Sequence, residues 1–284
     1  MLSLVTNQPN KMKISFKILL LITCTILQLN GQQTEERWDG YMAAYEEGKI
    51  GSTTLRMDLI DTAPIKDFNY VLVTGLSYET ADENGFPENE TLAILHNVAD
   101  QLIEIVMKET DYFNVGSFMY DKERLEYFYL KEPKDLVTVI ENFYKEKYPE
   151  YKFFVNIKED KEWTYYTDFL YPSEEVQNYM ADQSVLRSLE EAGDQLTKAR
   201  RIDHWFYFSA EDEMIQCKNE LIKAKFNVEH TNINKESSLP FELIVWRVDH
   251  VDIDTIYPIT SNLRILAAKF GGEYDGWETM VVTE

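Results

Sequence analysis

The last fifteen residues of the chain are Phe270-Gly-Gly-Glu-Tyr-Asp-Gly-Trp-Glu-Thr-Met-Val-Val-Thr-Glu284. Apolar residues recur just before them at spacings of three and four, as on one face of a helix: Ile256, Ile259, Leu263, Leu266 and Phe270. Gly271 and Gly272 follow this pattern, and glycine accepts the left-handed backbone that often ends a helix. We therefore expect a helix that ends at these glycines, then an acidic, aromatic turn, then a closing strand over residues 277–282.

The residues before this helix predict a β-α-β-β-α-β order. The expected elements are a strand at 202–208, a helix at 211–225, strands at 226–231 and 241–248, and the final helix and strand. Alternation along the first strand places His204 and Phe206 on one face and Trp205 and Tyr207 on the other. The order of elements is typical of a ferredoxin-like sandwich.

Residues 36–172 predict a separate α+β module with a mostly antiparallel sheet and two helices. Strands are expected at 38–47, 49–61, 68–76, 112–120, 124–130, 151–157 and 163–169, and helices at 89–109 and 133–147. Ser173 can cap the next helix. Residues 173–193 are therefore expected to form a connecting helix that leads to the second module at 194–284.

The N-terminus has the pattern of an export signal. Lys11, Lys13 and Lys17 precede a mostly apolar run at 18–27. Ten residues are too few to span a bilayer and are typical of a cleavable signal peptide. We expect a signal peptide over 1–31, a periplasmic or extracellular mature protein, and no stable membrane insertion after cleavage. Lipidation at Cys24 is a less favoured alternative, because this cysteine lies inside the apolar run.

The chain is strongly acidic, with a formal net charge of −22 over 284 residues. Such a surface repels phosphate backbones, so we expect no nucleic-acid partner. The charge indicates either a basic protein partner or a solvated acidic surface that keeps the protein soluble. Cys217 is the only cysteine after position 31, which rules out an internal disulfide in the mature chain. It shares a helical face with Met214 and Leu221, so we expect a buried thiol.

Two motifs in the last third resemble a known family. Arg201-Ile-Asp-His-Trp-Phe-Tyr-Phe208 and Gly271-Gly-Glu-Tyr-Asp-Gly-Trp-Glu278 are similar to segments of the ribonuclease E regulator B (RraB-like) family. The resemblance covers residues 182–284. It implies a ferredoxin-like fold and binding to ribonuclease E that restrains its activity.

The first module resembles the bacterial domain of unknown function number 695. The resemblance rests on Trp38 with Tyr41, on Asp61-Thr-Ala-Pro64, and on Trp163 with Phe169-Leu-Tyr-Pro172. It implies no activity. The additional module and the expected export both depart from the regulator pattern. Ribonuclease E works in the cytoplasm, so an exported protein would share the fold of the regulator without its partner.

The family motifs supply the candidate interaction residues: Arg201, His204, Trp205, Glu273, Tyr274, Asp275, Gly276, Trp277 and Glu278. Large aromatic residues are frequent anchors at interfaces, so Tyr274 and Trp277 either bind a partner or fill the core. His204 is either a packed histidine or a general base. The acids at 273–278, and those at 249–254 with His250, do not match the twelve-residue Ca²⁺ loop.

No motif for metal-dependent, nucleophilic or phosphate-binding catalysis is present. We therefore expect no catalytic residue, no metal and no cofactor. The favoured function is that of a non-catalytic exported protein that binds another protein. The alternatives are a cytoplasmic inhibitor of ribonuclease E and an uncharacterised hydrolase that uses His204 or the C-terminal acids.

Overall fold

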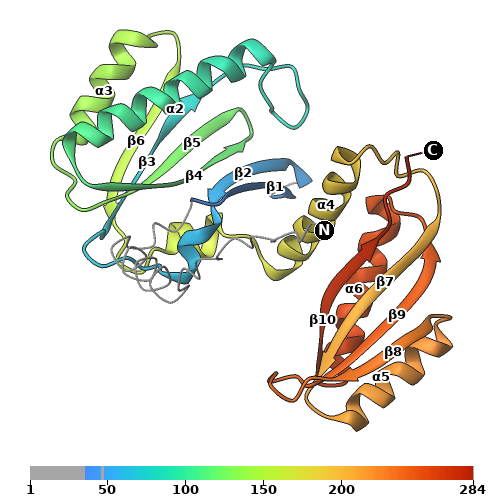
Figure 1. The fold of residues 1–284 in the computed structure, drawn as a ribbon. Helices are drawn as coiled ribbons and strands as arrows, with labels where there is room; N and C mark the ends of the chain where they lie inside the picture. The colour runs from blue at the N-terminus through green and yellow to red at the C-terminus, as the bar shows by residue number, and fades with distance from the viewer. Residues whose placement is uncertain (1–35, 46–47, 284) are drawn as a thin grey trace, which may run out of the picture.

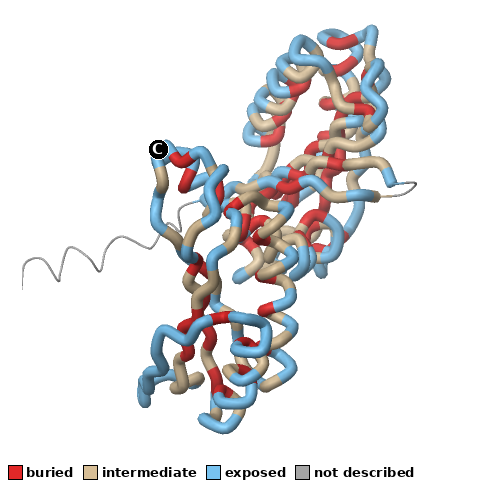
Figure 2. The backbone as a smooth tube through the Cα atoms, turned by 90° about the vertical axis from the view of Figure 1, so that its right-hand side faces the viewer, coloured by how far each residue is buried: buried red, intermediate tan, exposed pale blue. Residues whose placement is uncertain are grey.

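The computed structural model describes residues 36–45 and 48–283, and these form two α+β modules joined by a helix (Figure 1). The expected signal peptide at 1–31, with Cys24, lies outside the described residues. Figure 2 shows buried segments inside each module and exposed segments around them. Among the described residues, no helix is both long enough and apolar enough to cross a membrane.

The described part of the N-terminal module contains a six-stranded antiparallel sheet in the order β1-β2-β4-β5-β3-β6. The strands are β1 (Trp38–Ala44), β2 (Ile50–Arg56), β3 (Tyr70–Ser77), β4 (Tyr112–Tyr120), β5 (Glu123–Leu130) and β6 (Lys152–Glu159). Helices α2 (Asn89–Glu109) and α3 (Leu136–Lys147) cover one face, where Leu72 and Leu76 of β3 belong to the same core as Leu102 and Ile140.

The other face of this sheet is covered by short helical segments, where the sequence predicted strand. The strand expected at 49–61 ends at Arg56, and η2 (Met57–Asp61) follows as a 3₁₀ helix. The Arg56 guanidinium pairs with Asp58 at 2.6 Å where the strand gives way to this turn. The strand expected at 163–169 is also wrong, because η3 (Tyr165–Leu170) is a π-helical turn.

The carboxylate of Asp160 explains why residues 163–169 form a turn and not a strand. It accepts hydrogen bonds from the backbone N–H groups of Thr164 and Tyr165, both at 3.1 Å, and thus satisfies donors at the start of the turn. Trp163 then stacks on Tyr129 at 3.9 Å between ring centroids. Its indole N–H donates to the Phe68 carbonyl at 2.8 Å. These distant contacts outweigh the strand preference of aromatic residues.

The described part of the C-terminal module contains a four-stranded antiparallel sheet in the order β10-β7-β9-β8. The elements are β7 (Arg200–Phe208), α5 (Glu211–Lys223), β8 (Asn227–Ile233), β9 (Phe241–Asp249), α6 (Ile253–Lys269) and β10 (Gly272–Thr279). Both helices pack on the same face, where Phe206 and Val245 meet Cys217 and Leu263. This is the ferredoxin-like arrangement, and the expected α+β fold class with two modules is confirmed.

The closing strand begins earlier than expected. The residues assigned to an acidic turn at 273–276 belong to β10, and those at 280–282 lie beyond its end. Antiparallel pairing from Gly272 with Phe208 to Thr279 with Ile202 gives these residues their strand geometry. Gly271 has a φ of 67° after the helix ends, as the glycine pair predicted.

Helix α4 (Glu174–Glu191) contacts both modules. Its first residue follows Ser173, whose hydroxyl accepts a hydrogen bond from the Val176 N–H at 3.4 Å. Met180 packs into the core of the N-terminal module. Leu186 and Leu189, further along, pack into a buried cluster of the C-terminal module. One helix therefore ties the two modules together.

Candidate interaction surface

Strands β7 and β10 bring the two sequence motifs together, although about seventy residues separate them in the chain. The register pairs Trp277 with His204, Gly276 with Trp205, and Glu278 with Asp203. Every candidate residue from the sequence therefore lies on one pair of neighbouring strands. The two faces of this pair have different roles.

A β-bulge in β10 decides which side chains share a face. The register shifts between Tyr274 and Gly276, so Asp275 is an extra residue in the strand. In a regular strand, Tyr274 and Trp277 would point to opposite faces. With the bulge both contact buried clusters on the helix side. Gly276 has a φ of 147°, a backbone region that glycine adopts most readily.

Trp277 lies in the core. Its side chain is 7% exposed, and its indole N–H donates to Oδ1 of Asp182 on α4 at 3.0 Å. The Thr260 hydroxyl donates to the other oxygen of the same carboxylate, and Arg264 Nη2 lies 3.6 Å from Oδ1. Of the two roles considered for Trp277, the structure places it in the core. Its partner Asp182 was not predicted from the sequence, because nothing local distinguishes it from other acids on α4.

His204 is fully buried beside Tyr274. Its Nδ1 lies 2.9 Å from the Tyr274 hydroxyl, and its ring meets Phe226 edge-on. Burial lowers the pKa of His204 to about 3, and burial raises the pKa of Tyr274 above its usual range. His204 is therefore neutral at ordinary pH. Of the two roles considered for it, the packed histidine is the one that the structure shows.

The opposite face of the sheet carries half-exposed aromatic side chains. We call it the outer face, and its main residues are Arg201, Asp203, Trp205 and Tyr207 of β7 with Trp246 of β9. The β7 residues alternate with the buried positions of that strand, and Trp246 pairs with Asp203, so all of them point away from α5 and α6. The faces expected for residues 204–208 are thus confirmed. Trp246 was missed, although its pairing with Asp203 places it on this face.

Arg201 organises one end of the outer face. Its guanidinium pairs with Asp203 at 2.5 Å and with Glu229 at 2.7 Å, and it lies 4.8 Å from the centre of the Trp246 ring. The two carboxylates raise the pKa of Arg201 above its already high value. Its positive charge is therefore neutralised within the face.

The rest of the outer face is bordered by acids. Glu242 lies across from Tyr207 on β9, and Glu273, Asp275 and Glu278 are exposed along β10. Burial raises the pKa of Tyr207, with smaller contributions from the charges of Glu242 and Asp275. Among the described residues, no ion pair forms to the three acids of β10. The face therefore presents aromatic rings within a negative border.

Two protein families match separate parts of the chain. Residues 36–171 match a family of unknown function, DUF695. Residues 180–279 match Regulator of ribonuclease activity B. Both resemblances seen in the sequence are confirmed. No curated protein matches the chain.

The RraB region begins inside α4 and includes Asp182, whose carboxylate holds Trp277. It also includes both faces of the β7–β10 pair. Within the described residues, no group of three His, Cys, Asp or Glu side chains is placed to hold a metal ion. In the acid cluster considered at 249–254, Asp249 pairs with Arg247 at 2.8 Å, and Asp252 caps α6 by accepting from the Thr255 N–H at 2.9 Å.

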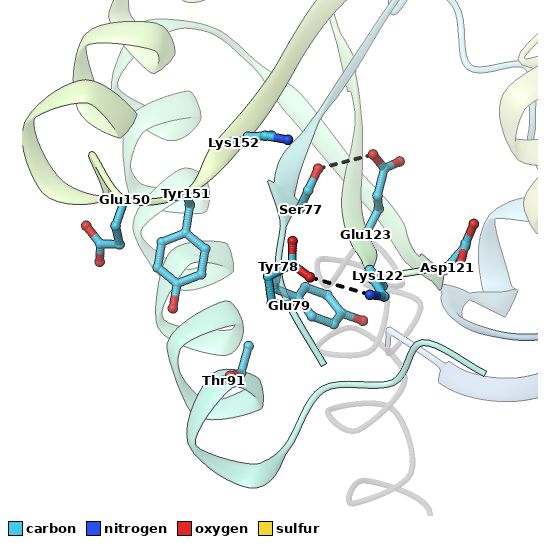
Figure 3. A pocket seen from close by; sticks show the side chains of 10 residues that line it. All are labelled: Ser77, Tyr78, Glu79, Thr91, Asp121, Lys122, Glu123, Glu150, Tyr151 and Lys152. Carbon is cyan, nitrogen blue, oxygen red and sulfur yellow. Dashed lines mark hydrogen bonds and ion pairs between the residues drawn. The ribbon is translucent and has the colours of Figure 1, made fainter. Parts of the chain in front are cut away.

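The DUF695 region has a hollow of about 550 Å³ at the ends of β3, β5 and β6 (Figure 3). Several of its polar groups bind one another. Lys122 pairs with Glu79 at 3.4 Å, and the Ser77 hydroxyl donates to Glu123 at 3.1 Å. The hollow is open and mixed in charge, so it does not indicate one class of ligand.

Proposed function

We propose that this protein acts without catalysis, by binding another protein through the outer face of its RraB region. The observation that carries the proposal is the partial exposure of Trp205, Tyr207 and Trp246 on a sheet face that neither α5 nor α6 covers. Tryptophan, tyrosine and arginine are the residues most enriched at interface hot spots. The match of residues 180–279 to a regulator family supports a protein-binding, regulatory role.

The charge of the face supports a basic partner. Glu242, Glu273, Asp275 and Glu278 border the aromatic residues, and the local cation Arg201 is already paired. Complementary charge steers encounter between proteins and sets their relative orientation. A partner surface rich in lysine or arginine meets this condition.

The surroundings of His204 support a non-catalytic role. A general base must come within hydrogen-bond reach of its substrate. His204 is fully buried, and its Nδ1 is engaged with the Tyr274 hydroxyl. A substrate would have to open the core to reach it. The hydrolase alternative is removed if a substrate panel shows no activity. Activity that His204→Gln and Asp275→Asn leave unchanged would exclude these two residues as its catalytic groups and would contradict the non-catalytic role.

Export is part of the proposal and rests on residues 11–31, where three lysines and an apolar run precede polar residues. N-terminal mass spectrometry on fractionated native cells tests it. A chain that starts near Gln32 outside the cytoplasm supports export. An intact N-terminus in the cytoplasm refutes it.

A second candidate function is cytoplasmic regulation of ribonuclease E, favoured by the family match of residues 180–279. It is tested with purified proteins. Slower cleavage of an RNA substrate by ribonuclease E in the presence of this chain would support it. Unchanged cleavage at a large excess of the chain would end it.

The outer face is tested by affinity capture with the full-length chain. Val248, which is 55% exposed beside Arg201, offers Val248→Lys, which adds a positive charge with little loss of packing. Trp246→Ala removes an aromatic ring from the same face. We expect both variants to lose the specific partner of the wild-type chain.

The matched control is Ile222→Ala. Ile222 is 51% exposed on α5, on the opposite side of the sheet. It should retain the partner. If Val248→Lys and Trp246→Ala, folded by circular dichroism, capture the partner as well as the control does, the outer face is not the binding surface.

A further inference from the structure

The bulge in β10 opens a hollow at the edge of the outer face. Its volume is about 400 Å³, near the lower end of the roughly 300–1,000 Å³ typical of ligand pockets. A Cβ atom added at Gly276 would meet no atom within 4 Å, so the strand leaves this space unfilled. A hollow of this size suits one side chain of a partner better than a large ligand.

Three aromatic and three carboxylate side chains line the hollow, including Trp277 of β10 and Asp182 of α4. Trp205 and Tyr207 approach from β7, and Asp275 and Glu278 from β10. The pKa of Tyr207 is raised by burial and, in smaller measure, by the charge of Asp275, which agrees with their closeness. Asp275 and Glu278 are exposed, and no ion pair forms to either within the described part of the chain.

The cation that also borders the hollow does not balance these acids. Arg264 lies 3.6 Å from Asp182 and 5.1 Å from the centre of the Tyr274 ring, and its buried Nη1 has no hydrogen-bond partner among the described residues. This one cation faces the three carboxylates of Asp182, Asp275 and Glu278 around the hollow. Asp275 and Glu278 remain in excess. An anionic ligand would meet this excess unfavourably, and a cation would meet it favourably.

We propose that this hollow binds one arginine or lysine side chain of the partner protein, with its charged group over Trp205 and beside Asp275 and Glu278. The geometry combines the two interactions that such a side chain makes best, cation–π contact and charge-assisted hydrogen bonds to carboxylates. The inference rests on the proposed protein-binding function and adds the chemistry of one contact. Figure 1 shows β10 at the edge of the sheet, where a partner can approach.

The probe for this site is N-acetyl-arginine methylamide, and its control is the citrulline counterpart, which has the same shape without the charge. Each is titrated into the isotopically labelled full-length chain and followed by nuclear magnetic resonance. We expect saturable shifts of the Gly276 amide and the Trp205 indole with the arginine probe only. Equal shifts with the citrulline probe, or no shift at Gly276, would overturn the proposal.

The variant Asp275→Asn/Glu278→Gln keeps the shape of the hollow and removes its charge. We expect at least tenfold weaker binding of the arginine probe, which corresponds to about 1.4 kcal/mol. The matched control is Asp212→Asn/Glu236→Gln, which makes the same change in net charge at exposed positions in α5 and the 234–240 loop. An equal loss in both variants would show a general effect of net charge and refute the site.

Partner capture separates this proposal from the wider one. If the Asp275→Asn/Glu278→Gln variant retains the partner while Trp246→Ala loses it, the hollow is not a binding contact and the outer-face proposal stands. If Trp246→Ala and Val248→Lys also retain the partner, the outer-face proposal fails with it. Loss in the double variant, with retention in the Asp212→Asn/Glu236→Gln control, supports both.

Discussion

Replacing Asp182 by asparagine should destabilise the C-terminal module by about 2–4 kcal/mol. The Asp182 carboxylate is 1% exposed and accepts from the Trp277 indole N–H and the Thr260 hydroxyl, while Arg264 lies 3.6 Å away. Asparagine keeps one acceptor oxygen and turns the other position into a donor. Hydrogen bonds to a charged group are worth about 1.5–3 kcal/mol, and a buried partner left unpaired costs about 1–3 kcal/mol. Arg264 also loses its counter-charge.

Urea unfolding followed by circular dichroism measures this effect. With a slope of roughly 2 kcal/mol per molar urea, the middle of the usual range, the midpoint should fall by about 1–2 M. The control is Glu190→Gln, an exposed acid on the same helix, which should change stability by less than about 0.5 kcal/mol. Trp277→Phe completes a double-mutant cycle, in which we expect the two effects to be coupled rather than additive. An Asp182→Asn protein as stable as the Glu190→Gln control would refute the reasoning.

Three further predictions concern buried or strained groups. Burial lowers the pKa of His204 to about 3 in the folded chain. Between that value and about pH 6.5, the unfolded chain binds a proton at this histidine that the folded chain does not bind. The stability that neutral His204 provides is therefore complete above about pH 6.5 and is lost as the pH falls toward 3. His204→Gln should flatten the fall in unfolding free energy over that window, and an unchanged slope would contradict the assignment. Burial raises the pKa of the Cys217 thiol to about 12, so a thiol reagent at pH 8 should react with Cys217 only when urea unfolds the chain. Rapid labelling of the native chain would instead show that the thiol is accessible. Gly276→Val should lower the free energy of unfolding in urea by about 1–3 kcal/mol, because valine is strained at a φ of 147° even though its Cβ would meet no neighbouring atom. Stability equal to that of the wild-type chain would show that the backbone of the bulge relaxes to accept valine.

Local periodicity predicted much of the fold because helices and strands repeat over a few residues. The helix at 89–109 and the strand at 112–120 occur within the bounds that apolar spacing predicted. The expectations failed where specific side-chain contacts, some local and some distant, set the backbone conformation. Residues 163–169 have strand-forming side chains, yet Asp160 and the stack on Tyr129 make them turn.

The sequence predicted which residues form the candidate site, but it did not predict how they divide between the buried face and the outer face of the sheet. The motifs at 201–208 and 272–278 were found by resemblance. Alternation within β7 then assigned Trp205 to the outer face, and the structure agrees. Trp246 and Asp182 were missed, since each matters only through a partner far away in the chain: Arg201 for the first and Trp277 for the second.

The sequence by itself determined the acidic charge, the order of the elements and the ferredoxin-like pattern in the last third, and the alternation along β7, because each depends on composition or on spacing between neighbours. Only the tertiary structure decided that Tyr274 and Trp277 share the buried face and that Asp275 and Glu278 line an open hollow. The bulge is defined by the pairing of β10 with β7. The carboxylate that accepts the hydrogen bond of the Trp277 indole N–H belongs to Asp182 on α4, 95 residues earlier in the chain. Pairing and packing over such distances are absent from any local pattern.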